Sequence, residues 1–161
     1  MCSYCGCHAI GPIGALAAEH ELIQNLMGEV RRSVLAGDHA TAVTLLGRLQ
    51  LVLAEHDAVE ELSIYPSMAR HGEFTVKVAS LFDEHDELDA VVDQALATAR
   101  DTASAAVDWT PVLAGFQMLM EHIQAEENGM FPAAAIALDT ADWERAERVR
   151  QEYRAAHGSL S

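Results

Sequence analysis

Apolar residues recur at steps of three and four along most of the chain, which is the spacing of helices that bury one face. These stripes predict long helices over about residues 13–36, 38–64, 74–100 and 110–132, and a short amphipathic helix over about residues 141–156. No stretch has the alternating pattern of a half-buried strand. Half of the residues are hydrophobic and only four are proline, which also favours helices. The sequence therefore predicts an all-α protein.

Local signals mark where these helices begin and end. Gly37 is expected to stop the first helix and Asp38 to cap the second, because its side chain can accept a hydrogen bond from the first turn. Pro66 is expected to bend or end the second helix, since proline removes a backbone donor and clashes with the preceding turn. Thr110 followed by Pro111 predicts the start of the fourth helix, with Thr110 as its cap.

One motif occurs in the second predicted helix and again in the fourth. Both copies read Glu-His-x3-Glu-Glu-x3-aromatic-Pro, over residues 55–66 and 121–132. Residues four apart lie on one face of a helix, about one turn from each other. In each copy a histidine and a glutamate have this spacing: His56 with Glu60, and His122 with Glu126. Each pair can offer an imidazole nitrogen and a carboxylate oxygen to one point, which is typical of a metal site.

The first and third predicted helices each carry a histidine that follows a glutamate, His20 and His85. The chain therefore looks like two similar halves, each with a lone-histidine helix followed by a His-x3-Glu helix. These polar residues interrupt apolar stripes, and burying so many ionisable groups around one point is costly without compensation. A metal centre supplies that compensation. The alternative is a buried hydrogen-bond network, which needs every member satisfied and does not explain the repeated spacing.

The donor set also indicates which metal is bound. Four imidazoles and two carboxylates are too many donors for one tetrahedral zinc ion. They suit two ions, with Glu60 and Glu126 as bridging ligands and the histidines as terminal ones. Nitrogen and oxygen donors without thiolate favour iron or manganese. Ferritin-like bundles use Glu-x2-His and are richer in carboxylate, whereas the histidine comes first here.

The repeated His-x3-Glu-Glu motif with its aromatic-Pro, flanked by single Glu-His helices, resembles the hemerythrin-like (HHE cation-binding) family over about residues 13–135. The Cys-Ser-Tyr-Cys-Gly-Cys start and the fifth helix look like those of stand-alone hemerythrin-like proteins of actinobacteria, including mycobacteria. The resemblance implies one domain over residues 1–161. It would contain an N-terminal Cys-rich arm (1–12), an antiparallel up-down-up-down four-helix bundle (13–135) and an extra short C-terminal helix (140–157).

The resemblance also implies a cofactor and its ligands. The cofactor would be two iron ions in an oxo- or hydroxo-bridged, non-haem di-iron centre that binds hydrogen peroxide, dioxygen (O2) or nitric oxide (NO). The iron ligands carried over from the family motifs are His20, His56, Glu60, His85, His122 and Glu126.

One position departs from the family pattern. Oxygen-carrying hemerythrins have a further histidine one turn before the position of His85, and here that residue is Leu81, which cannot bind a metal. Asp89 could substitute for the histidine geometrically, but it lies one turn after His85. The family site therefore lacks a donor, and another side chain is needed in its place.

Among the tyrosines, Tyr4 is our prediction for the substitute ligand. Helical periodicity points Tyr65 well away from the face that carries the second-helix ligands, and Tyr153 sits among charges on the fifth helix. Tyr4 lies on an arm long enough to fold back over the open end of the bundle. The alternative is that Tyr4 packs on the surface without reaching a metal.

Replacing an imidazole by an anionic oxygen donor stabilises ferric iron, which disfavours reversible O2 binding and favours redox turnover. We therefore expect catalase-like disproportionation of hydrogen peroxide. Glu61 and Glu127 would act as orienting groups or proton relays, or else as exposed helix residues. One alternative is a protein that binds or senses O2, NO or iron without turnover. A ligand carrier, which Leu81 argues against, and a purely structural bundle are the others.

Charge and composition exclude several classes of partner. The formal net charge is −15, which argues against nucleic acids and anionic membranes because phosphate contacts need clustered Lys and Arg. Neither an apolar run of transmembrane length nor a signal peptide is evident, so we expect a soluble, cytoplasmic protein.

All three cysteines, Cys2, Cys5 and Cys7, lie in the N-terminal arm. An odd number of cysteines does not suggest a disulfide framework. Together with His8 they could bind zinc or act as a redox element. The preferred interpretation is an arm with reduced thiols that lies on the bundle.

Overall fold

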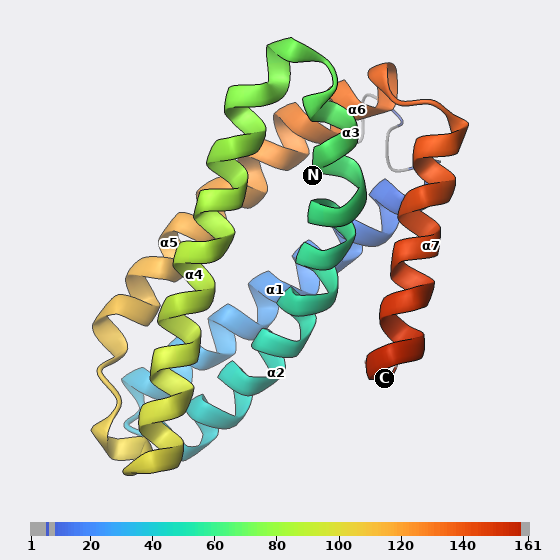
Figure 1. Cartoon of the computed structure of the whole chain (residues 1–161). Helices are drawn as coiled ribbons and strands as arrows, with labels where there is room; N and C mark the ends of the chain where they lie inside the picture. The colour runs from blue at the N-terminus through green and yellow to red at the C-terminus, as the bar shows by residue number, and fades with distance from the viewer. Residues whose placement is uncertain (1–5, 7–8, 159–161) are drawn as a thin grey trace.

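The computed structural model describes residue 6 and residues 9–158 (Figure 1). Within these residues all regular structure is helical, as the sequence predicts. Four long helices run alternately up and down, so that each is antiparallel to the one before it. They are α1 (Gly11–Leu35), α2 (His39–Val59), α4 (Thr75–Asp101) and α5 (Trp109–Ala125).

Helices α2 and α5 each continue through one wide turn into a shorter helix. The turns are π-helical, at Glu60–Ile64 and Glu126–Met130, and are followed directly by α3 (Tyr65–Ala69) and α6 (Phe131–Ala137). Pro66 lies in the first turn of α3, where its missing amide proton costs little. The second helical rod therefore continues past Pro66 instead of ending there.

The helix ends test the predicted capping signals. Gly37 adopts a left-handed conformation after α1 (φ +74°), and the Asp38 side chain accepts a hydrogen bond from the Thr41 amide at 3.1 Å. Both predictions are confirmed. The prediction that Thr110 caps α5 is wrong, because the Asp108 side chain accepts a hydrogen bond from the Thr110 amide at 2.9 Å. The aspartate therefore starts the helix two residues earlier and takes the capping role.

The last helix, α7 (Thr140–His157), lies outside the four-helix bundle and packs against α1, α2 and the π-turn Glu60–Ile64. It begins with a capping box in which Asp139 and Asp142 bind each other's backbone amides. Its predicted anchors, Trp143 and Val149, are partly buried against the core. Helix α7 therefore covers one side of the bundle only (Figure 1).

The hydrophobic core is divided into two clusters with a polar layer between them. On α1, Leu16 belongs to one cluster and Ile23 to the other, and His20 lies between these two residues in the sequence. The same order recurs on α4 around His85. The predicted ligands thus interrupt the core at one level of the bundle, where apolar residues above and below exclude water.

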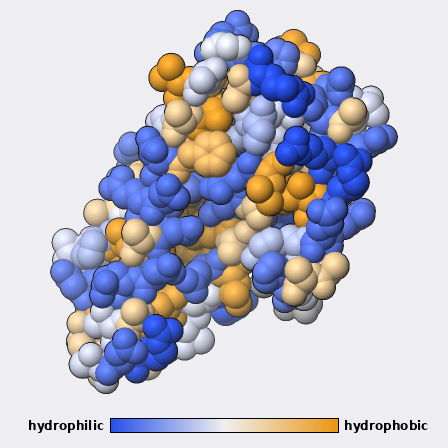
Figure 2. All heavy atoms as spheres, in the orientation of Figure 1, coloured by the Kyte–Doolittle hydropathy of each residue, from blue (hydrophilic) through white to orange (hydrophobic). Residues whose placement is uncertain are grey.

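The outer faces of the helices are mostly polar. Hydrophilic residues cover most of the face in Figure 2, and hydrophobic residues form separate groups on it. None of the helices in the described part of the chain has the length and apolar composition needed to span a membrane.

The predicted N-terminal arm falls largely outside the described residues. Tyr4, Cys2, Cys5 and Cys7 all belong to that part of the sequence. The expectation that Tyr4 reaches the centre therefore stays a prediction.

Candidate metal centre

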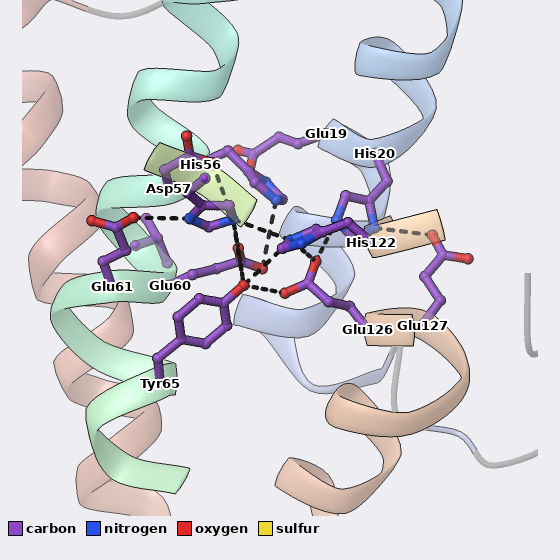
Figure 3. Close-up of polar contacts among 12 residues, drawn as sticks. Glu19, His20, His56, Asp57, Glu60, Glu61, Tyr65, His122, Glu126 and Glu127 are labelled. Carbon is purple, nitrogen blue, oxygen red and sulfur yellow. Dashed lines mark hydrogen bonds and ion pairs between the residues drawn. The ribbon is translucent and has the colours of Figure 1, made fainter. Parts of the chain in front are cut away.

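Six side chains from four helices and two π-turns converge in the polar layer (Figure 3). They are the six predicted ligands, and all are buried: His20, His56, Glu60, His85, His122 and Glu126. Their donor atoms form two groups, in each of which the atoms lie within 4.8 Å of one another. The first group contains His20, His56, Glu60 and Glu126, and the second contains Glu60, His85 and His122.

The distances in the centre bear out the predicted helical spacing. The Nε2 atom of His56 lies 3.5 Å from Glu60 Oε1, and that of His122 lies 3.4 Å from Glu126 Oε2. The Nε2 atom of His20, from α1, lies 3.2 Å from the same Glu126 oxygen. Glu60 Oε2 also lies 3.6 Å from His85 Nε2, so each glutamate offers carboxylate oxygens close to more than one imidazole.

The centre contains buried polar atoms that no protein group satisfies. Among the described residues, His20 Nε2, Glu60 Oε1 and Glu126 Oε2 are inaccessible to solvent and make no hydrogen bond. Leaving such an atom unsatisfied costs about 1–3 kcal/mol, and more when it is charged. A cation that accepts lone pairs from all three would remove this cost. The residues present therefore fit a bound metal.

A carboxylate holds the outer nitrogen of every histidine in the cluster. The four Nδ1···O pairs are His20 with Glu127 (3.1 Å), His56 with Glu19 (3.0 Å), His85 with Glu61 (2.8 Å) and His122 with Glu84 (2.7 Å). An ionised carboxylate only accepts hydrogen bonds, so each Nδ1 carries a proton and each Nε2 faces the centre. Nε2 is therefore the nitrogen of each imidazole that can bind a metal.

Two of these carboxylates were candidates in the sequence and two were missed. Glu61 and Glu127 contact imidazoles, which agrees with the interpretation as orienting groups and not with the alternative of exposed helix residues. Glu19 and Glu84 were not singled out, although each precedes a predicted ligand in a Glu-His pair. The sequence feature that could have identified these contacts is therefore the Glu-His pair, which occurs at Glu19-His20 and at Glu84-His85.

The repeat in the sequence becomes an approximate two-fold symmetry of the centre. We call α1 to α3 the first half and α4 to α6 the second half. The His20 and His56 rings lie 4.8 Å apart in the first half, and the His85 and His122 rings 4.7 Å apart in the second. In both halves the glutamate before the lone histidine accepts from the histidine of the repeated motif.

The expectation for Tyr65 is wrong, because its hydroxyl points into the centre (Figure 3). The hydroxyl donates to Glu126 Oε1 at 2.5 Å and lies 3.1 Å from Glu60 Oε2. It is also 3.4 Å from Nε2 of both His85 and His122. Tyr65 therefore places a phenol oxygen beside the second group of donor atoms.

The π-turn explains why regular helical periodicity misplaced this residue. A π-turn contains one extra residue, so a side chain five positions on returns to the same face. Tyr65 follows Glu60 by five, and the π-turn Glu60–Ile64 lies between them. Phe131 has the same relation to Glu126, and its ring stacks on His20 with centroids 5.5 Å apart. The aromatic-Pro element of each motif thus packs on the site.

The family model for the hemerythrin HHE cation-binding domain matches residues 11–134. The chain belongs to the hemerythrin HHE cation-binding family. Searches of curated proteins and of solved structures found no significant match. Family membership and the buried His/Glu cluster together indicate that this hemerythrin HHE domain binds metal, and its donors suit iron.

The two central glutamates of the HHE domain differ in their electrostatic surroundings. Burial and the neighbouring charge of Glu126 raise the pKa of Glu60 well above its ordinary value. Burial also disfavours the charge of Glu126, but the close contacts with the His122 and His20 imidazoles outweigh this effect and lower its pKa. One proton shared near Glu60 would therefore relieve the repulsion between the two carboxylates in the absence of a metal.

The two imidazoles of the first half also differ. Burial opposes protonation of His20, but the neighbouring carboxylates of Glu126 and Glu127 outweigh burial and raise its pKa to about 9. For His56 burial dominates over the contact with Glu19, and its pKa falls to about 4. His56 is therefore neutral at pH 7, whereas His20 must lose a proton when its Nε2 binds a metal.

Two further candidates for the missing donor lie outside the donor groups of the HHE domain. Asp89 is exposed, and Tyr153 stacks on His157 in α7. The sequence did not indicate Asp57, which is buried with Oδ1 3.7 Å from His85 Nε2. Asp57 and Tyr65 thus each place an oxygen atom beside His85 Nε2.

Proposed function

We propose that the chain binds two iron ions side by side in the buried cluster. Each ion would take two imidazoles from one half of the chain, and the glutamates of the repeated motif would bridge them. The proposed ligands are His20, His56, Glu60, His85, His122 and Glu126. Three buried donor atoms without hydrogen bonds, and the presence of Glu60 in both donor groups, support this proposal.

The donor set favours iron over a structural zinc ion. Structural zinc is almost always four-coordinate and tetrahedral, and often bound by thiolates. The cluster offers six nitrogen or oxygen side chains, and Tyr65 adds a phenol oxygen beside them. Such sets suit iron or manganese, which take more ligands.

We further propose that the protein disproportionates hydrogen peroxide. One peroxide molecule takes up two electrons and two protons, its O–O bond breaks, and two water molecules form. A second peroxide loses two electrons and two protons and leaves as O2. When bound, the iron pair would supply the redox chemistry by holding the two electrons between these half-reactions.

The single observation that carries this proposal is the exchange of a nitrogen donor for an oxygen donor in the second half. Leu81 occupies, within an apolar cluster, the position where oxygen carriers have a histidine. The Tyr65 hydroxyl lies 3.4 Å from the two imidazoles of this half instead. An anionic oxygen ligand stabilises ferric iron, which favours turnover over reversible O2 binding.

Two groups of the chain would handle protons at the site. Burial and the charges of Glu60 and Glu126 raise the pKa of Tyr65 well above its ordinary value, so without a metal it keeps its proton. Tyr65 would lose that proton when iron binds, which leaves it as the anionic oxygen ligand. Glu61 accepts from His85 Nδ1 and its side chain is 32% exposed, so it links the buried centre to solvent.

Peroxide could approach between α4 and α5. A surface hollow there is lined by Lys77, Glu84, Met118, Glu121, His122 and Ala125. His122 is the one proposed ligand among these residues, and Glu84 binds its Nδ1. Peroxide is small and uncharged, so the acidic lining would not repel it.

The test combines metal analysis with an oxygen-electrode assay. The purified full-length chain, loaded with iron and freed of unbound iron by a chelator, should contain two irons per chain and release O2 from hydrogen peroxide. His56→Ala should lose iron and activity, whereas His39→Ala, outside the cluster, should keep both. Absence of tightly bound iron, or O2 release no greater than that of His56→Ala, would overturn the proposal.

A binding function without turnover is the second candidate. The four imidazoles of the cluster favour it, because imidazole ligands stabilise the ferrous state that binds O2 or NO. In that case exposure of the reduced protein to air or NO should give a reversible change in the visible spectrum. Peroxide would then release no O2.

A further inference from the structure

The two halves of the centre also differ in what covers them, because α7 packs on the first half only. In the second half Glu84, which binds His122 Nδ1, also accepts a hydrogen bond from Ser80 at 2.9 Å. In the first half the equivalent Glu19 instead receives the guanidinium of Arg150 from α7. Arg150 Nη1 contacts Glu19 Oε1, and Nη2 lies 3.2 Å from Oε2, the oxygen that faces His56 Nδ1.

Arg150 is held in place by a second buried carboxylate. Its side chain is only 7% exposed, and Nη1 also donates to Glu55 Oε1 at 2.9 Å. Arg154 donates to the same oxygen at 2.7 Å. The position equivalent to Glu55 in the second half is Glu121, which is exposed and binds only Gln117 among the contacts described. Among the contacts described, the two arginines of α7 thus pair with carboxylates of the first half only.

We infer that Arg150 is a positioning residue for the metal position of the first half. It clamps both oxygens of Glu19, so that Glu19 holds the proton on His56 Nδ1 and turns His56 Nε2 to the centre. It also shares the negative charge of Glu19, which makes His56 a weaker electron donor than His122. Helix α7 thereby renders the two metal positions unequal. The inference rests on the proposed two-iron centre.

The competing explanation is that Arg150 only holds α7 on the bundle and has no effect on the metal position. Breaking a buried ion pair is destabilising whatever lies next to it, so loss of stability alone does not distinguish the two roles. Arg154 provides the distinction, because it pairs with Glu55 and makes no contact with Glu19 in the described structure. Glu19 provides a second one, because its loss leaves the contacts of α7 with Glu55 intact.

The experiment compares Arg150→Met with Arg154→Met in the iron-loaded, full-length protein. Competition with a chelator measures the affinity of each ion, and Mössbauer spectroscopy of ⁵⁷Fe resolves the two sites. Arg150→Met should weaken one of the two ions by about 10- to 100-fold and shift one Mössbauer doublet, with the other unchanged. Arg154→Met should change neither.

Three further variants extend the test, and two of them, Glu19→Gln and Arg150→Lys, keep it decisive if Arg150→Met does not fold. Glu19→Gln should reproduce the weakened ion and the shifted doublet, since a neutral amide replaces the clamped carboxylate. The double variant, Arg150→Met with Glu19→Gln, should bind the weakened ion no more weakly than Glu19→Gln alone, because both changes act on one contact. Arg150→Lys should recover only part of the effect, since an ammonium group cannot grip both oxygens as a guanidinium does.

The results distinguish a positioning role of Arg150 from a purely structural one. If Arg150→Met and Glu19→Gln lower thermal stability but leave the affinity for both iron ions and both doublets unchanged, Arg150 only holds α7 on the bundle and the inference is wrong. The same holds if Arg154→Met changes the spectrum as much as Arg150→Met. Failure of the wild-type protein to bind two irons would instead refute the proposed function, and would be seen before any variant is made.

Discussion

The Tyr65 hydroxyl lies 2.5 Å from Glu126 Oε1, although the two residues are 61 positions apart in the sequence. Tyr65 belongs to the first copy of the repeated motif and Glu126 to the second, so this contact joins the two halves at the centre. The π-turn after Glu60 makes it possible by returning Tyr65 to the ligand face. The phenol oxygen thereby enters a set of donors that would otherwise consist of imidazoles and carboxylates.

Tyr65→Phe tests whether this oxygen takes part in the chemistry. The variant makes the first motif copy like the second, in which Phe131 has the equivalent place. Iron should remain bound, because the six proposed ligands are unchanged. A phenolate-to-iron absorption band should disappear, and O2 release from peroxide should fall, because the anionic oxygen ligand that favours ferric iron is lost.

The controls for Tyr65→Phe are two other tyrosine variants. Tyr153→Phe, on α7, should leave the spectrum and the rate unchanged. If the band persists in Tyr65→Phe and vanishes in Tyr4→Phe, the N-terminal arm supplies the phenolate, as the sequence suggested. If it persists in both, no phenolate binds the iron.

Removal of the metal should destabilise the fold. Without a cation, Glu60 and Glu126 lie close together, fully buried, with donor atoms that make no hydrogen bond. Metal at about 1,000 times its dissociation constant would stabilise the native state by about 4 kcal/mol. For a chain of this size that corresponds to roughly 10 °C in Tm.

Thermal unfolding followed by circular dichroism measures this effect. Chelator treatment should lower Tm, anaerobic addition of Fe²⁺ should restore it, and Mg²⁺ should not, because Mg²⁺ prefers oxygen ligands and retains its water. Equal Tm values with and without iron would contradict a metal held by these buried donors.

A pH effect is expected where α7 meets α3. Asp142 accepts hydrogen bonds from Arg70 at 2.6 Å and from buried Ser67 at 2.8 Å. Burial disfavours its charge, but these hydrogen bonds outweigh burial and lower the pKa of Asp142 below the ordinary value of 3.8. Its contribution to stability is therefore complete above pH 3.8 and is lost as the pH falls through the lowered value.

Asp142→Asn should accordingly be less stable than the wild type by about 1–2 kcal/mol near neutral pH, a modest figure because Arg70 is largely exposed. Urea unfolding between pH 7 and pH 3 measures the difference, which should be constant down to about pH 5 and narrow below pH 3.8. Asp83→Asn, at an exposed position, is the control. A difference that widens as the pH falls would show that the sign of the effect is wrong.

The sequence predicted well which six side chains come together, because their positions follow from regular helix geometry. His56 and Glu60 share a face at a spacing of four, and the repeated motif makes a chance arrangement improbable. The lone histidines could be placed at the same level because their helices carry apolar stripes on both sides of them. Packing of the four helices against one another then brings the four imidazoles together.

The features that the sequence did not predict depend on departures from that geometry or on tertiary contacts. Tyr65 was misplaced because periodicity assumes 3.6 residues per turn, and nothing in a single sequence marks a π-turn. Arg150 was not singled out, because nothing in the sequence distinguishes it from the other charged residues of its helix, yet it is buried because Glu19 and Glu55 face it from other helices. The pairing of Arg150 with these two glutamates depends on how α7 packs on the bundle.

Leu81→His should move the protein from peroxide turnover toward reversible binding of O2. Leu81 is fully buried one turn before His85, so a histidine there would restore the imidazole that oxygen carriers have. A fifth imidazole favours ferrous iron, so O2 release from peroxide should fall, and the reduced protein should show a reversible spectral change in air. Without iron, the buried imidazole should lower stability by roughly 2–4 kcal/mol, and iron should recover part of this loss.

The matched control is Leu88→His, which introduces the same side chain on the same helix within the other apolar cluster. It should cost similar stability, because Leu88 is also buried, but iron should recover none of it and the reaction with peroxide should be unchanged. If Leu81→His keeps the wild-type rate and spectrum while iron remains bound, the missing imidazole does not determine the reaction. The choice between turnover and reversible binding would then rest with Tyr65 or with the nearby carboxylate of Asp57.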